Sequence, residues 1–322
     1  MKILITFKTF PEQRQLLEQF FEKRSELIFW EDHPVEMKKD LISEADILFT
    51  WNPEREGLYT FNNINSLQKV KFIQLFSAGY DHVKLDMFPP NIIIASNQGA
   101  FAEPMAEHVL AMMLSLSKKL LIYHNKLKEG KFDQLSSLTK PIKETVVGII
   151  GFGSIGKETA RLLRPFDVKI LAINTTGKTN EDIEFIGTLR DLDYVLKNSD
   201  TLLISCPLTE QTNGLLNKQK LELMKEDAIL INVARGEIIN QRDFYYHLKT
   251  HPNFYAGIDA WWVEPFKDGK FEIKYPFFEL PNLLGSPHNS AMVNGALKLA
   301  IEKAAANIER FINNGNATGI IR

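Results

Sequence analysis

The chain has 322 residues, of which 44% are hydrophobic and 24% charged, and this ordinary globular composition predicts two domains. Its 38 lysines and arginines nearly balance 40 aspartates and glutamates, so the formal net charge of −2 argues against a nucleic-acid-binding protein. No apolar run approaches the roughly 18–20 residues of a membrane-spanning helix, and the N-terminus turns charged too soon for a signal peptide.

Short apolar runs alternate with amphipathic stretches along the first hundred residues. Helical spacing of apolar residues occurs at 11–26 and 35–44, and buried strands are predicted at 2–7, 46–50, 70–76 and 91–95. Alternation of strands and helices predicts a parallel sheet that is covered on both faces. We therefore expect one α/β unit in this part of the chain.

A second α/β unit begins with a long helical stretch at 102–129. Its strands are predicted at 145–150, 168–173, 201–205, 228–232, 254–259 and 280–287, with helices between them, including one at 155–164. A last helical pattern covers 291–314. We expect the chain to cross between the units near residues 98 and 290, so that the C-terminal helix rejoins the first unit.

Gly151, Gly153 and Gly156 form a GxGxxG turn between the strand predicted at 145–150 and the helix predicted at 155–164. In a dinucleotide-binding turn, the first glycine permits the tight turn and the second admits the pyrophosphate. The third lets the helix pack on the strand, and the helix N-terminus attracts the anion. Because a strand precedes the turn and a helix follows it, a nucleotide site is favoured over a plain structural turn.

The acidic residue that usually ends the second strand of such a unit is replaced by Asn174. Asparagine can hydrogen-bond a ribose, but it does not repel a 2′-phosphate as aspartate does. Thr175, Thr176 and Lys178 are candidates to bind such a phosphate, although a simple polar loop explains the segment equally well. The sequence therefore leaves NAD and NADP open.

Arg235, Glu264 and His288 each follow a predicted strand, where ligands bind in open α/β folds. Arginine binds a carboxylate in bidentate fashion. Histidine exchanges protons near neutral pH, and a carboxylate beside it fixes its tautomer. Each residue taken alone is explained as an ordinary surface or loop residue, but the three together suit reduction of a carbonyl next to a carboxylate.

Read together, these segments resemble the D-isomer-specific 2-hydroxyacid dehydrogenase family, and the similarity extends over nearly the whole chain. The motifs that carry it are SAGYDHV (77–83), NQGAFAEPMAEHVLAMML (97–114), GFGSIGKETARLL (151–163), CPLTEQTNGLLN (206–217), ILINVARGEIIN (229–240), IDAWWVEP (258–265) and SPHNSA (286–291). The resemblance implies two Rossmann- or flavodoxin-like, doubly wound α/β domains with a cleft between them. Residues 1–98 and 291–322 would form a split substrate-binding (catalytic) domain, and residues 99–290 the dinucleotide-binding domain.

The resemblance also implies roles for individual residues. Arg235 would bind the carboxylate and keto oxygen of a small 2-keto or 2-hydroxy acid, His288 would be the general acid, and Glu264 would hold His288 protonated. Backbone amides around Ala78 and Gly79 would receive the substrate carboxylate. Asp259 would lie near the nicotinamide amide, and the full set implied for NAD or NADP is Gly151, Gly153, Ser154, Ile155, Gly156, Asn174, Thr175, Cys206, Pro207, Val233, Ala234, Arg235, Asp259 and His288.

The expected partners and compartment follow from the same features. The resemblance implies a homodimer built partly on the long helix after residue 100. The single cysteine, Cys206, excludes an internal disulfide and a cysteine-based zinc site, and no HExxH motif occurs, so we expect a cytoplasmic protein without a metal.

Several questions stay open at the level of sequence. Members of the family act on glyoxylate, hydroxypyruvate, pyruvate, branched keto acids or phosphoglycerate. The formate-oxidising branch is disfavoured because it typically has glutamine at the position of Glu264. A dinucleotide-sensing, corepressor-like binding protein on the same fold is the alternative to an enzyme, and it is disfavoured because no extension typical of partner docking is recognised.

Overall fold

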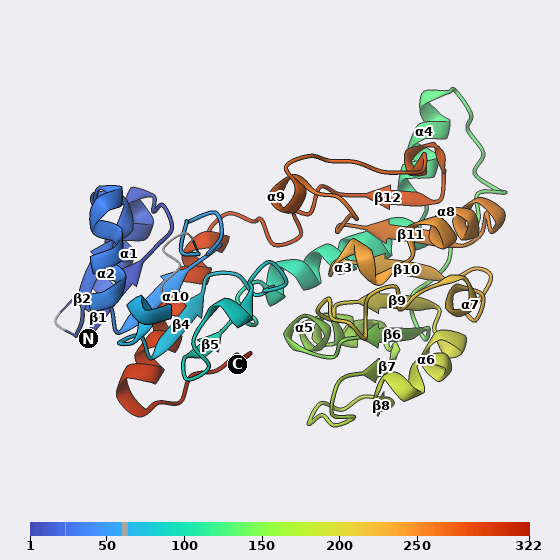
Figure 1. Ribbon diagram of the computed structural model, residues 1–322. Coiled ribbons are helices and arrows are strands. Elements are labelled where there is room, and N and C mark those ends of the chain that lie inside the picture. Colours follow the sequence, from blue (N-terminus) through green and yellow to red (C-terminus); the bar gives the residue numbers. More distant parts are fainter. Residues whose placement is uncertain (23, 60–63) are drawn as a thin grey trace. The chain divides into compact units, whose positions relative to one another are not determined.

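The chain divides into two units in the computed structural model, which describes residues 1–22, 24–59 and 64–322. The N-terminal unit consists of Met1–Phe101 and Asn294–Arg322, and the central unit of Ala102–Val293 (Figure 1). The chain thus passes between units three residues beyond each boundary expected from the sequence. Within the described ranges, no helix is long and apolar enough to cross a membrane.

The N-terminal unit contains five parallel strands in the order β2-β1-β3-β4-β5. This is the order of flavodoxin-like doubly wound sheets. The strands are β1 (Lys2–Ile5), β2 (Glu26–Phe29), β3 (Ile47–Thr50), β4 (Phe72–Leu75) and β5 (Ile93–Ala95).

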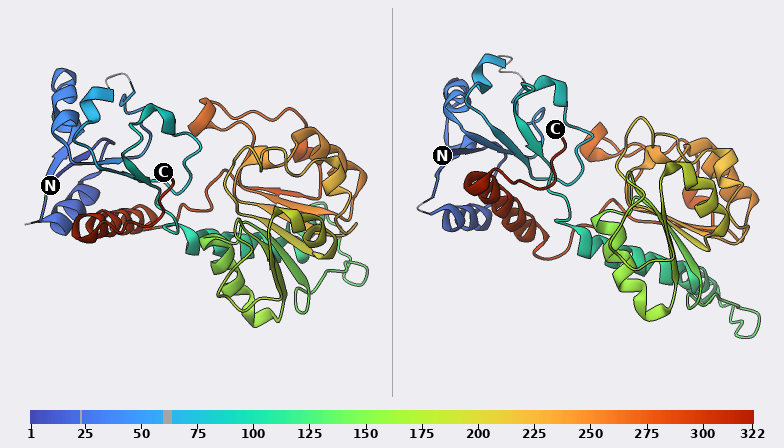
Figure 2. Two further views of the ribbon diagram at one scale, coloured as in Figure 1. Left: turned by 60° about the horizontal axis from the view of Figure 1, so that its bottom comes forward. Right: turned by 90° about the horizontal axis from the view of Figure 1, so that it is seen from below.

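Alternate residues of these strands pack against helices on opposite faces of the sheet. Ile3 and Ile5 of β1 join a core with α1 (Pro11–Phe21) and α10 (Ala296–Asn314). Leu4 joins the core on the other face, which includes α2 (Lys38–Glu44). Figure 2 shows α10, the red helix near the C-terminus, beside the blue N-terminal elements with which it packs.

The central unit contains seven parallel strands in the order β12-β11-β10-β9-β6-β7-β8. Counted from its own first strand, this is the Rossmann order 3-2-1-4-5-6 with a seventh strand added beside the sixth. Its order reverses between β6 and β9, where such folds bind dinucleotides. The strands are β6 (Val146–Ile150), β7 (Lys169–Ile173), β8 (Phe185–Gly187), β9 (Thr201–Ile204), β10 (Ile229–Asn232), β11 (Tyr255–Ile258) and β12 (Leu283–Gly285).

Helices cover both faces of this sheet, and the predicted fold class of two parallel α/β domains is confirmed. On one face lie α3 (Ala102–Ser117) and α5 (Ser154–Leu163). The other face is covered by α6 (Leu192–Asn198), α7 (Lys218–Leu221) and α8 (Gln241–Thr250). Two further helices, α4 (Leu120–Lys128) and α9 (Pro265–Asp268), lie in connecting segments.

Three sequence predictions of secondary structure were wrong in part. The helix predicted at 11–26 ends at Phe21, and Glu26 begins the edge strand β2. The helix predicted at 102–129 is two helices, because Lys119 has a left-handed backbone with φ of 51°. The three-residue strand β8 was not predicted. Short edge strands such as β2 and β8 carry too few residues for periodicity to separate them from neighbouring helices or loops.

Candidate active site

The carboxyl edge of the central unit's sheet brings together most residues that the sequence analysis identified. Because all seven strands are parallel, the segments after them emerge at one edge. These segments carry the glycine turn after β6, Asn174 and Thr175 after β7, Cys206 and Pro207 after β9, Val233–Arg235 after β10, Asp259 and Glu264 after β11, and His288 after β12. Ala78 and Gly79 follow β4 in the N-terminal unit, and their role stays a prediction.

The three glycines of the turn after β6 are required for different structural reasons. Gly151 has φ of +97°, and a Cβ there would collide with the backbone of Cys206. A Cβ on Gly156 would lie 2.9 Å from the Gly151 carbonyl oxygen, so this glycine lets α5 pack on the strand. At Gly153, by contrast, no atom of the described residues lies within 4 Å of the Cβ position, its own neighbours along the chain excepted. This open space beside the helix N-terminus fits the pyrophosphate of a dinucleotide.

Cys206 is buried where β9 ends, directly against the glycine turn. Burial raises the pKa of its thiol to about 12. The side chain is therefore a neutral thiol at physiological pH, which makes it unsuitable as a nucleophile.

Arg235 is positioned by a tight turn at the end of β10. The fully buried Asn232 accepts a hydrogen bond from the Ala234 N–H (3.0 Å) and donates one to the Arg235 carbonyl (2.8 Å). The next residue, Gly236, touches the backbone of Trp261 so closely that no side chain fits there. The turn therefore places Arg235 beside the segment that follows β11.

His288 and Glu264 form a close pair of titratable groups at this edge. His288 Nδ1 lies 2.6 Å from Glu264 Oε2, and the two side chains are 34% and 15% exposed. Glu264 is itself held by the Trp261 N–H, which donates to Oε1 at 2.6 Å. Because Nδ1 faces a carboxylate, it carries the hydrogen, and Nε2 is the ring nitrogen left to exchange a proton with a ligand.

Asp259 anchors the loop that carries His288. Its side chain has no exposed surface; Oδ1 accepts from the Ser286 hydroxyl (2.5 Å) and the Asn289 N–H (3.0 Å), and Oδ2 from the Ser290 N–H (3.1 Å). Burial raises the pKa of Asp259, but the hydrogen bonds from Ser286 and Ser290 outweigh it and hold the pKa below its usual value.

The backbone of His288 is strained. Its φ is 50°, a conformation that costs about 1–3 kcal/mol and persists only when its surroundings fix it.

Two residues at this anchor were missed by the sequence analysis. Ser286 also binds Trp261, whose indole N–H donates to the Ser286 carbonyl at 2.8 Å. His108, on α3, lies with Nε2 3.0 Å from the Ser286 hydroxyl oxygen. Because that hydroxyl donates its hydrogen to Asp259, His108 is the donor in this contact. Both residues fall inside motifs quoted for the family resemblance, but 178 positions separate them and no spacing rule connects them.

A pair of histidines four residues apart also escaped the sequence analysis, although such spacing is typical of metal ligands. The rings of His247, on α8, and His251, which follows that helix, stack with centroids 4.1 Å apart, and His251 Nδ1 contacts the His247 carbonyl at 2.9 Å. Burial, together with the neighbouring His251, lowers the pKa of His247 to about 4. Among the residues described, no three histidine, cysteine or acidic side chains gather as a metal site would require.

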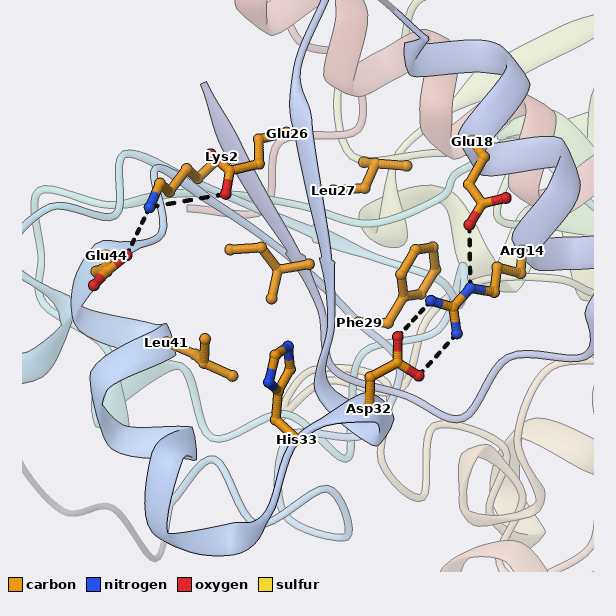
Figure 3. Close-up of a pocket in the computed structure, with 11 residues that line it drawn as sticks. Lys2, Arg14, Glu18, Glu26, Leu27, Phe29, Asp32, His33, Leu41 and Glu44 are labelled. Carbon is orange, nitrogen blue, oxygen red and sulfur yellow. Dashed lines mark hydrogen bonds and ion pairs between the residues drawn. The ribbon is translucent and has the colours of Figure 1, made fainter.

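A pocket of about 410 Å³ along the edge strand β2 contains none of the candidate residues (Figure 3). Its cations are paired within it, Lys2 with Glu26 and Glu44, and Arg14 with Glu18 and Asp32. Figure 3 shows the two groups on opposite sides of the pocket, with Leu27 and Phe29 between them. These charges satisfy one another, so the pocket is not a candidate active site.

Comparison with known proteins identifies the family. Residues 110–290 match the NAD-binding domain of D-isomer specific 2-hydroxyacid dehydrogenases, more than half of the chain. Glyoxylate reductase of Pyrococcus furiosus is 26% identical over 322 residues, 96% of this chain and 92% of that protein. Hydroxypyruvate reductase of Thermotoga maritima is 29% identical over 253 residues, 78% and 79% of the two chains. The structure of a D-isomer specific 2-hydroxyacid dehydrogenase family protein from Aeromonas salmonicida aligns with a TM-score of 0.80 and 24% identity, covering 100% of this chain and 98% of that one. The chain belongs to the D-isomer-specific 2-hydroxyacid dehydrogenase family, as its motifs predict.

Proposed function

We propose that Arg235, Glu264 and His288 are the catalytic residues with which this NAD(P)-dependent enzyme reduces a small 2-keto acid to the D-2-hydroxy acid. The observation that carries the proposal is the 2.6 Å contact between His288 and Glu264. It lies at the sheet edge that also bears the glycine turn, and it pairs a proton donor with the carboxylate that orients it.

Each of the three side chains has its own role in the proposed reduction. When bound, the nicotinamide would supply the hydride for the carbonyl carbon, or accept it in the reverse direction. His288 Nε2 delivers the proton to the carbonyl oxygen, which completes the alcohol. Glu264 holds the Nδ1 hydrogen and balances the positive charge of the imidazolium. Arg235 binds the substrate carboxylate and stabilises negative charge that develops on the keto oxygen.

The turn from Gly151 to Gly156 is proposed to hold the cofactor pyrophosphate. Support comes from the open space at Gly153 and from the N-terminus of α5, whose first amides lack partners within the helix. Cys206, Pro207 and Val233 follow the neighbouring strands β9 and β10 and are proposed to line the same site.

Substitutions at the two charged positions test the catalytic assignment. We expect His288→Ala to lower kcat by roughly 100- to 10,000-fold, the usual contribution of a general acid, while NAD(P)H binding by fluorescence titration stays unchanged. Arg235→Gln should mainly raise KM for the keto acid. His33→Ala, which removes a histidine of the unrelated β2 pocket, is the matched control. Turnover by His288→Ala at the wild-type rate would contradict the assignment.

A homodimer is proposed to form through the arm made of α4 and the segment up to residue 140 (Figure 1). This arm exposes six large apolar side chains to solvent: Leu120, Leu121, Leu127, Phe132, Leu135 and Leu138, which are 46–90% exposed. Several large apolar side chains exposed on one short segment are typical of a protein interface. Analytical ultracentrifugation should show a dimer, and a monomer for the double variant Phe132→Ser/Leu135→Ser; a monomeric wild type would contradict the proposal.

We infer that the protein works in the cytoplasm. Its single cysteine is free and buried, which suits a reducing compartment. Recovery of the native protein in the cytoplasmic fraction of its cells is the expected result, and recovery outside the cytoplasm would contradict it.

A further inference from the structure

The loop after β7 occupies the position where a dinucleotide-binding unit recognises the adenosine ribose. In this loop the Asn174 side-chain oxygen is fully engaged. Its oxygen accepts from the Gly177 N–H (2.7 Å), the Thr176 N–H (3.0 Å) and the Thr176 hydroxyl (3.3 Å). Its amide group donates to the Lys178 carbonyl at 2.9 Å. Asn174 thus stabilises the loop, and its oxygen has no lone pair left to accept a hydrogen bond from a ribose hydroxyl.

A second loop, after β8, lies against the first. The Asn174 N–H donates to the Gly187 carbonyl at 3.0 Å, and a Cβ on Gly177 would lie 3.2 Å from the Thr188 methyl group. The first loop ends in Lys178 and the second contains Arg190, and both side chains are exposed. Two cationic side chains therefore belong to adjoining loops at this edge.

No carboxylate within residues 174–178 or 187–190 balances these two cations. Among the described residues, neither Lys178 nor Arg190 takes part in an ion pair. The acid nearest to Lys178 in sequence, Glu181, pairs instead with Lys157 and Arg164. The acid next to Arg190, Asp191, is turned back into its own loop, where it accepts from the Thr188 N–H at 2.8 Å. The loops at the expected ribose position thus carry two cationic side chains, and the Asn174 oxygen is not available to accept a hydrogen bond from the ribose.

We propose that these two loops select NADP(H) over NAD(H) by binding the 2′-phosphate of the cofactor. Lys178 and Arg190 supply the charge, and Thr175, an exposed residue, offers a hydroxyl as a further donor. An NAD-type site needs an acceptor for the ribose hydroxyls, which Asn174 does not offer. The inference rests on the proposed function because it concerns the same cofactor site.

Binding of the two cofactors to the purified full chain tests this directly, with isothermal titration calorimetry as a readout that is independent of turnover. We expect NADPH to bind at least 10-fold more tightly than NADH, since each charge-assisted hydrogen bond is worth about 10-fold or more in affinity. Salt should weaken NADPH binding more than NADH binding. Adenosine 2′-monophosphate should compete more strongly than adenosine.

Variants that change the charge of the two loops test whether Lys178 and Arg190 cause the preference for NADPH. Lys178→Gln/Arg190→Gln should weaken NADPH binding 10- to 100-fold and leave NADH binding within about 2-fold. Asn174→Asp keeps the acceptor oxygen, loses the amide that donates to the Lys178 carbonyl and adds a negative charge, so it should weaken NADPH binding further relative to NADH. Lys197→Gln, which removes an exposed lysine on α6, is the matched control.

The outcomes separate this inference from the proposed function. NADH binding as tightly as NADPH, or equal loss of both in the charge variants, would overturn the selectivity and leave the enzyme assignment intact. Failure to bind either nucleotide would overturn the proposed function, and the inference with it.

Discussion

Replacement of Asp259 by asparagine should both destabilise the central unit and reduce turnover. The carboxylate receives three hydrogen bonds, from Ser286, Asn289 and Ser290, and it is completely buried. An asparagine side chain has one acceptor oxygen instead of two. The most favourable arrangement keeps the two donors on Oδ1 and turns the new amide group toward the Ser290 N–H, which then loses its partner.

The magnitude follows from these contacts. An unsatisfied N–H at Ser290, a residue 2% exposed, costs about 1–3 kcal/mol, and the two remaining bonds weaken as their acceptor loses its charge. Relief of the buried charge does not compensate, because the pKa of Asp259 is lowered and the fold therefore favours the ionised form. We expect a loss of about 2–4 kcal/mol at neutral pH. Since the folded pKa is depressed, this contribution disappears only as the pH falls below the ordinary aspartate value.

The effect on turnover has the same origin. Without its anchor, the loop is free to leave the strained conformation of His288, whose cost is about 1–3 kcal/mol, so kcat should fall roughly 10-fold or more. Urea unfolding followed by circular dichroism measures the first effect and steady-state kinetics the second. Asp193→Asn, at an exposed ion pair with Lys220, is the control. Wild-type stability and kcat for Asp259→Asn would refute the reasoning.

Further predictions concern His247 and the glycine turn. The pKa of His247 is about 4 in the folded protein against an ordinary 6.5, so the unfolded chain binds more protons between these two pH values. The free energy of unfolding should therefore fall as the pH is lowered from 6.5 to 4, by at most about 3 kcal/mol. The urea midpoint of His247→Leu should lose this pH dependence, and an unchanged pH profile would contradict the prediction. Gly151→Ala should unfold the turn region and lower Tm, because the methyl group meets the Cys206 backbone. Gly153→Ala should keep Tm but weaken NAD(P)H binding in titrations, because its methyl group enters the open side of the turn. Equal effects of the two alanines on Tm would count against the assignment of the open side.

The sequence predicted most of the sheet elements because buried parallel strands are continuous apolar runs, such as ILIN before Arg235. It failed at β2 and β8, which are short and lie at sheet edges, and at Lys119, where a left-handed residue interrupts an otherwise continuous helical pattern. Local conformation of this kind depends on tertiary packing, which periodicity does not register.

The candidate site likewise contains residues that the sequence predicted and contacts that it did not. Motifs predicted that Arg235, Glu264 and His288 follow strands of one sheet, and the structure places all three at its carboxyl edge; their catalytic roles stay a prediction. The supporting contacts of Ser286 and His108 were not predictable, since they join α3 to a loop 178 residues later. The engagement of Asn174 within its own loop likewise required coordinates.

The central claim is that the chain reduces 2-keto acids with His288 as the proton donor. The most direct test follows oxidation of NADPH and NADH by the wild type and by His288→Ala, with glyoxylate, hydroxypyruvate, pyruvate and 2-ketoisocaproate as substrates, and determines the configuration of any chiral product. We predict rapid turnover of at least one acid by the wild type, D-configured product, and loss of turnover in His288→Ala with cofactor binding retained. Tight cofactor binding without turnover of any acid, or full activity of His288→Ala, would contradict the account.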